Sequence, residues 1–191
     1  SATGAPTCID LPAGTYTAVV TKTFKEGPNS ITAWANDTAG HISNASSNFT
    51  VDTISPTIGF VSPTFNSSAF LQLDYIQVNV SANDTNLANI TISLYNSSKK
   101  LISSVNTTTD STLFANFTGL PDGVYYFNAT AYDTVKHVRN TTTWNVSLDT
   151  QSPIISIASP ANGLMYNSTS IKVNLSVTEL NPSKIWFFNG T

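Results

Sequence analysis

Hydrophobic and polar residues alternate along much of this chain. In its middle, Ile76, Val78 and Val80 are separated by single polar residues, and similar runs follow further along. A period of two is typical of a β-strand with one face buried and the other in water. We therefore predict half-buried antiparallel strands and an all-β fold. The expected core is made by Ile76, Val78, Val80, Ile90, Ile92, Phe127, Ala129, Trp144 and Val146.

Turn-forming residues divide these strands at short intervals. Asn, Asp, Ser, Gly and Pro cluster between the alternating runs, for example at Asn96-Ser97-Ser98 and Pro121-Asp122-Gly123. The pattern gives roughly seven strands in one domain of about a hundred residues, which is the strand count of an immunoglobulin-like β-sandwich.

The chain also repeats itself. Residues 55–64 (SPTIGFVSPT) recur 97 residues later as residues 152–161 (SPIISIASPA). Residues 33–44 (AWANDTAGHISN) recur as residues 129–140 (ATAYDTVKHVRN), with the aspartates and histidines aligned. A repeat of this length corresponds to one small all-β domain, so we expect sandwich domains in tandem.

The repeat sets the expected domain boundaries. Residues 54–150 form a complete domain, residues 1–53 the back half of another, and residues 151–191 the front half of a third. The front half should not fold alone, because its strand edges and an apolar face stay uncovered. That face is made by Ile155, Ile157, Ile171, Val173, Leu175 and Val177.

The two halves together are nearly as long as one repeat. We therefore expect the front half of one copy to be completed by residues 1–53 of the next copy, giving a head-to-tail filament that does not close. The completion could join separate chains, or it could occur within one longer chain. The lack of a signal peptide slightly favours the longer chain.

Asparagines in the N-glycosylation pattern Asn-x-Ser/Thr are far more frequent than composition predicts. Sixteen of the twenty asparagines match, whereas roughly five would match by chance. Solvent-facing Asn, Ser and Thr in a β-rich chain explain part of the excess, but an extracellular glycoprotein with N-linked glycans explains it better. The acceptors are Asn36, Asn44, Asn48, Asn66, Asn79, Asn83, Asn89, Asn96, Asn106, Asn116, Asn128, Asn140, Asn145, Asn167, Asn174 and Asn189.

Charge and cysteine content narrow the possibilities further. A net charge of −3, with no basic cluster, argues against nucleic-acid binding, and no apolar run is long enough for a membrane span. Cys8 is the only cysteine, so no disulfide can form within the chain. Cys8 is either an inert thiol or a link between two chains.

One segment resembles a known group of proteins. The run from Leu120 to Tyr125 (LPDGVY), followed by FNATAYD and the linker VSLDTQSP, resembles the tandem immunoglobulin-like or fibronectin-III-like repeats of prokaryotic, especially archaeal, cell-surface proteins. The resemblance implies that Tyr125 is a tyrosine-corner residue. Residues 11–16 (LPAGTY) repeat this motif out of phase, as a second corner or an edge strand.

Catalysis has little support in the sequence. His41 and His137 are the only histidines and follow equivalent Asp-Thr turns, so we expect structural roles and no enzyme. Interdomain calcium is the better chemical hypothesis, with Asp52, Asp84 and Asp133 as ligands from loops at one junction. Asp149 and Glu179 would lie at the next junction. The alternative is that each carboxylate supports its own turn.

Three classes of function are compatible with these observations. The first is a structural surface protein, either a filament subunit or a segment of a surface-layer or stalk protein. The second is an adhesin that binds a carbohydrate or a partner cell, and the third is a module attached to a catalytic domain elsewhere. Trp34, Trp144 and Trp186 are scattered and form no sugar-binding face, which favours the structural role.

Overall fold

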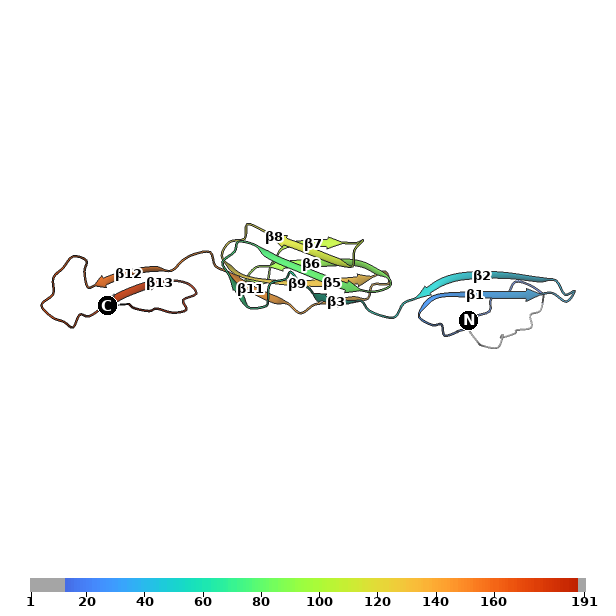
Figure 1. Cartoon of the computed structure of the whole chain (residues 1–191). Coiled ribbons are helices and arrows are strands. Elements are labelled where there is room, and N and C mark those ends of the chain that lie inside the picture. The colour runs from blue at the N-terminus through green and yellow to red at the C-terminus, as the bar shows by residue number, and fades with distance from the viewer. Residues whose placement is uncertain (1–12, 189–191) are drawn as a thin grey trace.

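The computed structural model describes residues 13–188, and these form thirteen strands without a helix. Figure 1 shows a central β-sandwich with one hairpin beyond each end, so that the three parts lie in a line. The predicted all-β class is therefore confirmed. The central sandwich contains strands β3 to β11, and the two hairpins contain the other four strands.

The first sheet of the sandwich has three antiparallel strands. Its order is β3 (Thr57–Phe60), β5 (Ile76–Asn83) and β8 (Thr112–Phe117). The central strand β5 is buried at every second residue, as its alternating sequence predicts.

The second sheet packs against the first. Its order is β4 (Ala69–Leu71), β11 (Trp144–Leu148), β9 (Gly123–Asp133), β6 (Leu87–Tyr95) and β7 (Leu101–Thr107), and β10 (Val138–Asn140) also pairs with β9. Only β4 and β11 are parallel neighbours among these described strands. This is the strand arrangement of an immunoglobulin-like sandwich. The sandwich has nine strands rather than the expected seven, because β4 and β10 are too short to show a period.

The core lies between the two sheets, where the alternation predicts it. Phe127 is fully buried at its centre, and its ring meets the ring of Phe60 edge-on with centroids 5.5 Å apart. Every predicted core residue is buried except Trp144, which is half-buried and packs against Phe60 at a centroid distance of 4.4 Å. A side chain this large at the end of a strand reaches the margin of the core and stays partly in water.

Each terminal hairpin repeats part of the sandwich. The first is formed by β1 (Gly27–Asn36) and β2 (Ile42–Val51), the second by β12 (Ile154–Ser159) and β13 (Asn174–Thr178). β12 and β13 pair in the register of β3 and β5, and β1 and β2 pair in the register of β9 with β10 and β11. The sequence repeat is therefore also a structural repeat.

The tyrosine corner is confirmed in the central sandwich. The Tyr125 hydroxyl donates a hydrogen bond of 2.8 Å to the carbonyl oxygen of Pro121. At the equivalent place in the first hairpin, the amide of Asn29 donates to the carbonyl oxygen of Lys25, also at 2.8 Å. Tyr16 instead bonds the carbonyl oxygen of Ala13 and is 45% exposed. The described part of residues 11–16 is therefore neither an equivalent corner nor a strand.

Candidate functional site at the domain junctions

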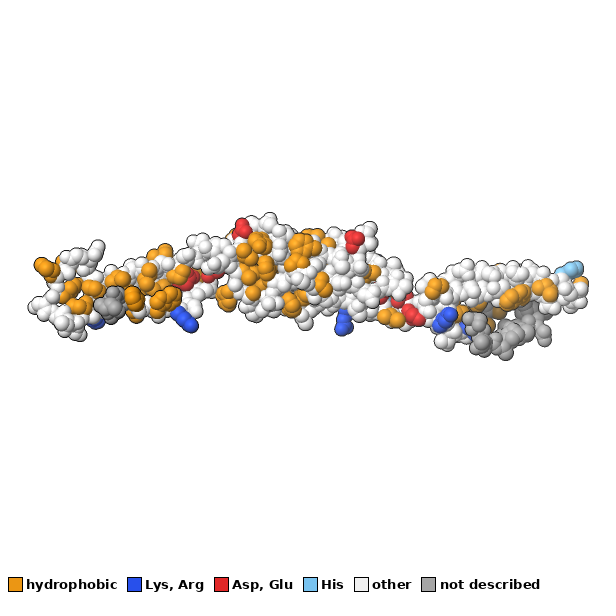
Figure 2. Space-filling view, viewed as in Figure 1, with side chains coloured by type: hydrophobic (Ala, Val, Ile, Leu, Met, Phe, Trp, Pro, Cys, Tyr) orange, Lys and Arg blue, Asp and Glu red, His pale blue; other side chains and the backbone are white. Residues whose placement is uncertain are grey.

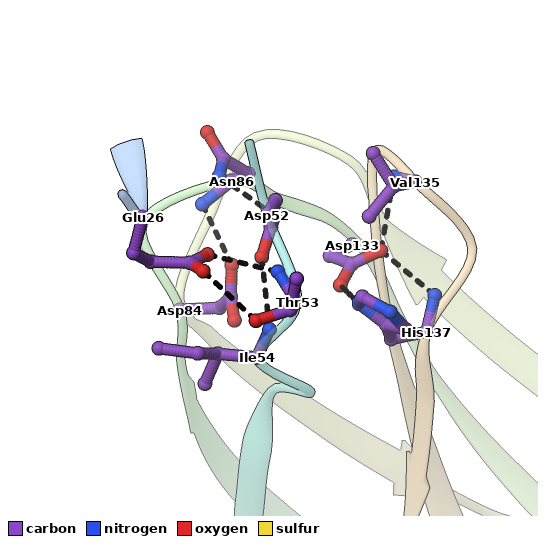
Figure 3. A network of polar contacts seen from close by, with 9 residues as sticks. All are labelled: Glu26, Asp52, Thr53, Ile54, Asp84, Asn86, Asp133, Val135 and His137. Carbon is purple, nitrogen blue, oxygen red and sulfur yellow. Dashed lines mark hydrogen bonds and ion pairs between the residues drawn. The ribbon is translucent and has the colours of Figure 1, made fainter. Parts of the chain in front are cut away.

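A buried carboxylate holds the loop that follows strand β9. Asp133 accepts hydrogen bonds at Oδ1 from the backbone N–H groups of Val135 (3.0 Å) and His137 (2.8 Å), as Figure 3 shows. Its Oδ2 lies 2.7 Å from Nδ1 of the His137 ring. An aspartate that accepts from the backbone two residues on is the usual support of a tight turn. Since the Asp133 side chain is fully buried, these bonds replace its hydration.

The same contacts set the charge of this group. Burial is the largest single influence and raises the pKa of Asp133, but it is outweighed. The backbone N–H and the side chain of His137, the charge of that side chain and the N–H of Val135 together lower the pKa below its ordinary value of 3.8. Asp133 therefore carries a negative charge at neutral pH, at the end of the sandwich where strand β9 ends.

The first hairpin contains the same turn in a different environment. Asp37 accepts from the N–H groups of Ala39 (3.0 Å) and His41 (2.9 Å), and its Oδ2 lies 2.7 Å from Nδ1 of His41. The hydrogen bond from the His41 side chain is the main reason that the pKa of Asp37 is lowered. The Asp37 and His41 side chains are exposed to solvent. At the turn of Asp133, by contrast, the linker from β2 to β3 runs alongside, as Figure 3 shows.

That linker is held by a second set of polar contacts. Asp52 accepts at Oδ1 from the N–H of Ile54 (3.2 Å) and at Oδ2 from the side-chain amide of Asn86 (2.7 Å). Glu26 accepts from both the N–H (2.8 Å) and the hydroxyl (2.9 Å) of Thr53. The linker is thus bonded to the hairpin before it and to the sandwich after it (Figure 3).

The junction after the sandwich repeats these contacts. The side-chain amide of Asn181 donates to Asp149 at 3.0 Å, as Asn86 does to Asp52. Asp122 accepts from the N–H of Thr150 at 2.9 Å, as Glu26 does from Thr53. Figure 2 shows Asp and Glu side chains at both linkers. The structure therefore brings the predicted carboxylates to the junctions, Asp149 and Glu179 to the second one.

The candidate metal ligands differ in part from the predicted set. Within residues 13–188, Asp52, Asp133 and His137 each offer a ligand atom, and these atoms all lie within 4.8 Å of one another. Asp84 does not belong to this group and instead accepts from the N–H of Asn86 at 2.7 Å. The sequence predicts a structural role for His137, and its repeated spacing from an aspartate is the signal that could identify it as a ligand. Two carboxylates with an imidazole suit zinc better than calcium, which prefers oxygen ligands.

The acceptor asparagines occupy accessible positions. Asn189 and Cys8 lie outside the described residues, and none of the other fifteen acceptor asparagines is buried. Those in strands, such as Asn79, Asn128 and Asn145, alternate with buried neighbours and point away from the core. A glycan at these positions would leave the core packing unchanged.

Comparisons with known proteins place the chain in no family. Neither the family models nor the curated proteins gave a match. Among solved structures, a tetra-tandem repeat from the extending region of a large adhesion protein matches at 18% identity and a TM-score of 0.42, covering 80% of this chain and 38% of that one. The fibronectin(III)-like modules of Clostridium thermocellum CbhA match at 19% identity and a TM-score of 0.34, covering 64% and 62%.

A third similarity is to CopC from Methylosinus trichosporium, at 15% identity and a TM-score of 0.38, covering 49% of this chain and 94% of that chain. The TM-score is low in all three comparisons, so the fold assignment rests on the strand order described above. Among the described residues there is no helix of the length and hydropathy that crossing a membrane requires.

Proposed function

We propose that this chain is a structural, N-glycosylated protein of the extracellular surface, and that it is the repeating unit of an extended fibre. The observation that carries the proposal is the pair of terminal hairpins. Each hairpin reproduces strand pairs that lie within one half of the central sandwich, and each leaves the other half of a sandwich unfilled in the described part of the chain.

The second hairpin supplies the front half of a sandwich. Ile155 pairs with Val177 and Ile157 with Leu175, which repeats the pairing of β3 with β5. Yet Val173 is 51% exposed, while its counterpart Val78 in β5 is fully buried. Figure 2 shows hydrophobic side chains gathered along this hairpin. In the central sandwich the equivalent face is covered by the sheet that contains β9.

The first hairpin supplies the back half. Ile31 on β1 occupies the position of Phe127 on β9, and it is 46% exposed where Phe127 is fully buried. Phe24 meets Phe49 edge-on at 4.7 Å, which begins a core on this face. The face is one layer of a sandwich without the layer that would pack on it.

The two hairpins are therefore complementary parts of one domain. In the central sandwich, the front and back halves are joined by the pairs β5–β8, β6–β9 and β4–β11. The same pairs would form between residues 154–188 of one copy and residues 13–51 of a second copy. Burying each exposed Ile or Val would contribute about 1.5–3 kcal/mol as an upper estimate. Because the two faces differ, the contact is head-to-tail and extends without closing.

A mixing experiment tests the second copy as the partner. We expect purified chains to form oligomers whose length rises with concentration in analytical ultracentrifugation. Ile31→Asp blocks one face and Ile157→Asp the other, so each variant alone should be monomeric. A mixture of the two variants should form dimers and nothing longer, because one intact face of each kind remains. Thr32→Asp and Ser156→Asp, which change the opposite sides of the same strands, should assemble like the unmodified chain.

Two results would overturn the proposed assembly. One is a chain that stays monomeric at every concentration. The other is assembly that both face variants leave unchanged. Electron microscopy of the unmodified chain should show linear particles in which the sandwiches are evenly spaced.

The surface location is supported by composition and by accessibility. The fifteen described acceptor asparagines are all at least partly exposed, and charged residues make up only 10% of the chain. Neutral polar groups and attached sugars would then keep the fibre soluble. The adhesin alternative needs a grouped aromatic face for a free ligand, and the exposed tryptophans do not form one, because Trp34 lies on β1 and Trp186 lies beyond β13. A structural role is therefore our proposal.

A further inference from the structure

A shallow groove of about 340 Å³ lies on the outer face of the second sheet, on the side away from the core. It is lined by Tyr95, Lys99, Tyr126, Asn128 and Thr143. Tyr95 on β6 lies directly opposite Tyr126 on β9, and Ser93 lies opposite Asn128. Three of the five lining residues, Tyr95, Tyr126 and Asn128, therefore lie on two paired strands of the sandwich.

The chemistry of the groove fits a sugar ring. Two half-buried tyrosines give aromatic surface, and the Lys99 ammonium group lies 5.7 Å from the centre of the Tyr126 ring. The Thr143 hydroxyl adds a further polar group at the rim. A pyranose has an apolar C–H face that packs on aromatic rings and hydroxyl groups that pair with such polar groups.

Asn128 forms part of the groove wall and is itself an acceptor in Asn-Ala-Thr. Its Nδ2 donates to the Thr143 hydroxyl at 3.4 Å, and its Oδ1 accepts from the Tyr95 hydroxyl at 3.4 Å. Tyr126, two residues earlier on the same strand, points to the same face. A sugar attached at Nδ2 thus begins inside the groove, at the high effective concentration of a tethered ligand.

We propose that this groove seats the first sugar of a glycan attached to Asn128, an inference that rests on the glycosylation in the proposed function. In the transfer step, the bond between Nδ2 and C1 of the sugar forms, and the C1–O bond of a phosphate-linked sugar donor breaks. The phosphate leaves with the electron pair, and Nδ2 loses one proton. The N–H that remains can donate to the Thr143 hydroxyl, and Oδ1 can still accept from the Tyr95 hydroxyl.

The test uses the full chain secreted from a host that attaches glycans beginning with N-acetylglucosamine. Glycopeptide mass spectrometry measures which asparagines are occupied. A peptide-N-glycosidase is then applied under native conditions, and the release of each glycan is followed over time. Asn106, exposed on β7 and outside the groove, is the matched acceptor.

We expect Asn128 to be occupied and its glycan to be released about tenfold more slowly than the one at Asn106. Tyr126→Thr should remove this difference while leaving release at Asn106 unchanged. Asn128→Gln should lower the melting temperature of the glycosylated chain by about 4 °C, and it should cause no such loss in the Tyr126→Thr background. These results together would support a seated sugar.

Other outcomes count against the inference. Equal release at Asn128 and Asn106, or equal melting losses in both backgrounds, would mean that the sugar does not lie in the groove. An empty Asn128 among occupied neighbours would overturn the inference alone and leave the proposed surface function standing. If every acceptor is empty, both the inference and the proposed glycosylation are wrong.

Discussion

Val78 and Val173 occupy the same position in two repeats, and replacing each with alanine compares the same change in two environments. Val78 is fully buried within β5, and Val173 is 51% exposed beside β13. Residues 76–81 and 171–176 align in sequence, so local strand propensity is closely similar. The difference between the two variants therefore measures the missing half of the sandwich.

The expected magnitudes follow from burial. Val78→Ala removes two buried methyl groups, worth about 1.6 kcal/mol of transfer free energy, and leaves a cavity that adds to this cost. We expect a loss of about 2 kcal/mol in the free energy of unfolding, or roughly 8–16 °C in melting temperature for a domain of this size. Val173→Ala should change the unfolding of the central sandwich by less than about 0.5 kcal/mol.

Urea unfolding of the full chain at low concentration provides the assay. Trp144 packs against Phe60 in the sandwich, whereas Trp34 and Trp186 are 68% and 81% exposed, so the change in fluorescence mainly reports the central domain. Far-ultraviolet circular dichroism should give the same midpoint for that domain. At higher concentration, Val173→Ala should weaken assembly while Val78→Ala does not. Equal losses of stability for both variants would refute the reasoning, because they would mean that Val173 is already packed.

Three further predictions concern the corner, the loop carboxylate and the junction. Tyr125→Phe should cost about 1 kcal/mol in urea unfolding because it removes the bond to Pro121, while Tyr16→Phe should have almost no effect; equal losses would contradict this. Because the pKa of Asp133 is lowered from 3.8, its contribution to stability is present above pH 3.8 and is lost as the pH falls through the lowered pKa. Thermal melts should therefore show acid destabilisation below pH 3.8, and Asp133→Asn should reduce it. Adding calcium, then a chelator, should leave the melting temperature unchanged because the ligand set of Asp52 and Asp133 includes the His137 imidazole, which suits zinc better than calcium; a rise that Asp52→Asn abolishes would instead establish a calcium site.

The core was predictable because burial in a sandwich follows the simplest periodicity. Every second residue of β5 and β9 faces the opposite sheet, so the alternation itself identifies the buried side chains. Trp144 deviates because it lies at the start of β11, where the core meets solvent. Short strands such as β10 carry too few residues for any periodicity to emerge.

The site was predictable only in part. The aspartates at the junctions could be placed from loop order, but the distances between side chains from different loops depend on backbone geometry. Asp84 and Asp52 each support their own turn, but Asp52 also accepts from the side chain of Asn86, and the sequence does not show this difference. The resemblance of residues 11–16 to a corner was also misleading, because the position equivalent to Tyr125 is Asn29, which keeps the hydrogen bond but not the aromatic ring.

The parallel pairing of β4 with β11 has a mechanical consequence. The chain enters the sandwich before β3 and leaves it directly after β11, at the opposite end in Figure 1. Tension applied between the two linkers would therefore pull β4 and β11 in opposite directions along their own axes. Their neighbouring bonds, from Ser68 N–H to the Asn145 carbonyl (2.6 Å) and from Asp149 N–H to the Leu71 carbonyl (3.0 Å), share that load in shear.

A hairpin such as β1–β2, pulled from the ends of its two strands, instead opens one bond at a time. Single-molecule stretching should therefore show the sandwich rupturing in one step, at a higher force than the hairpins. Replacing Ala69 with proline, which perturbs β4 without entering β9 or β6, should lower that rupture force. We therefore expect the three residues of β4 to set the force at which the sandwich ruptures.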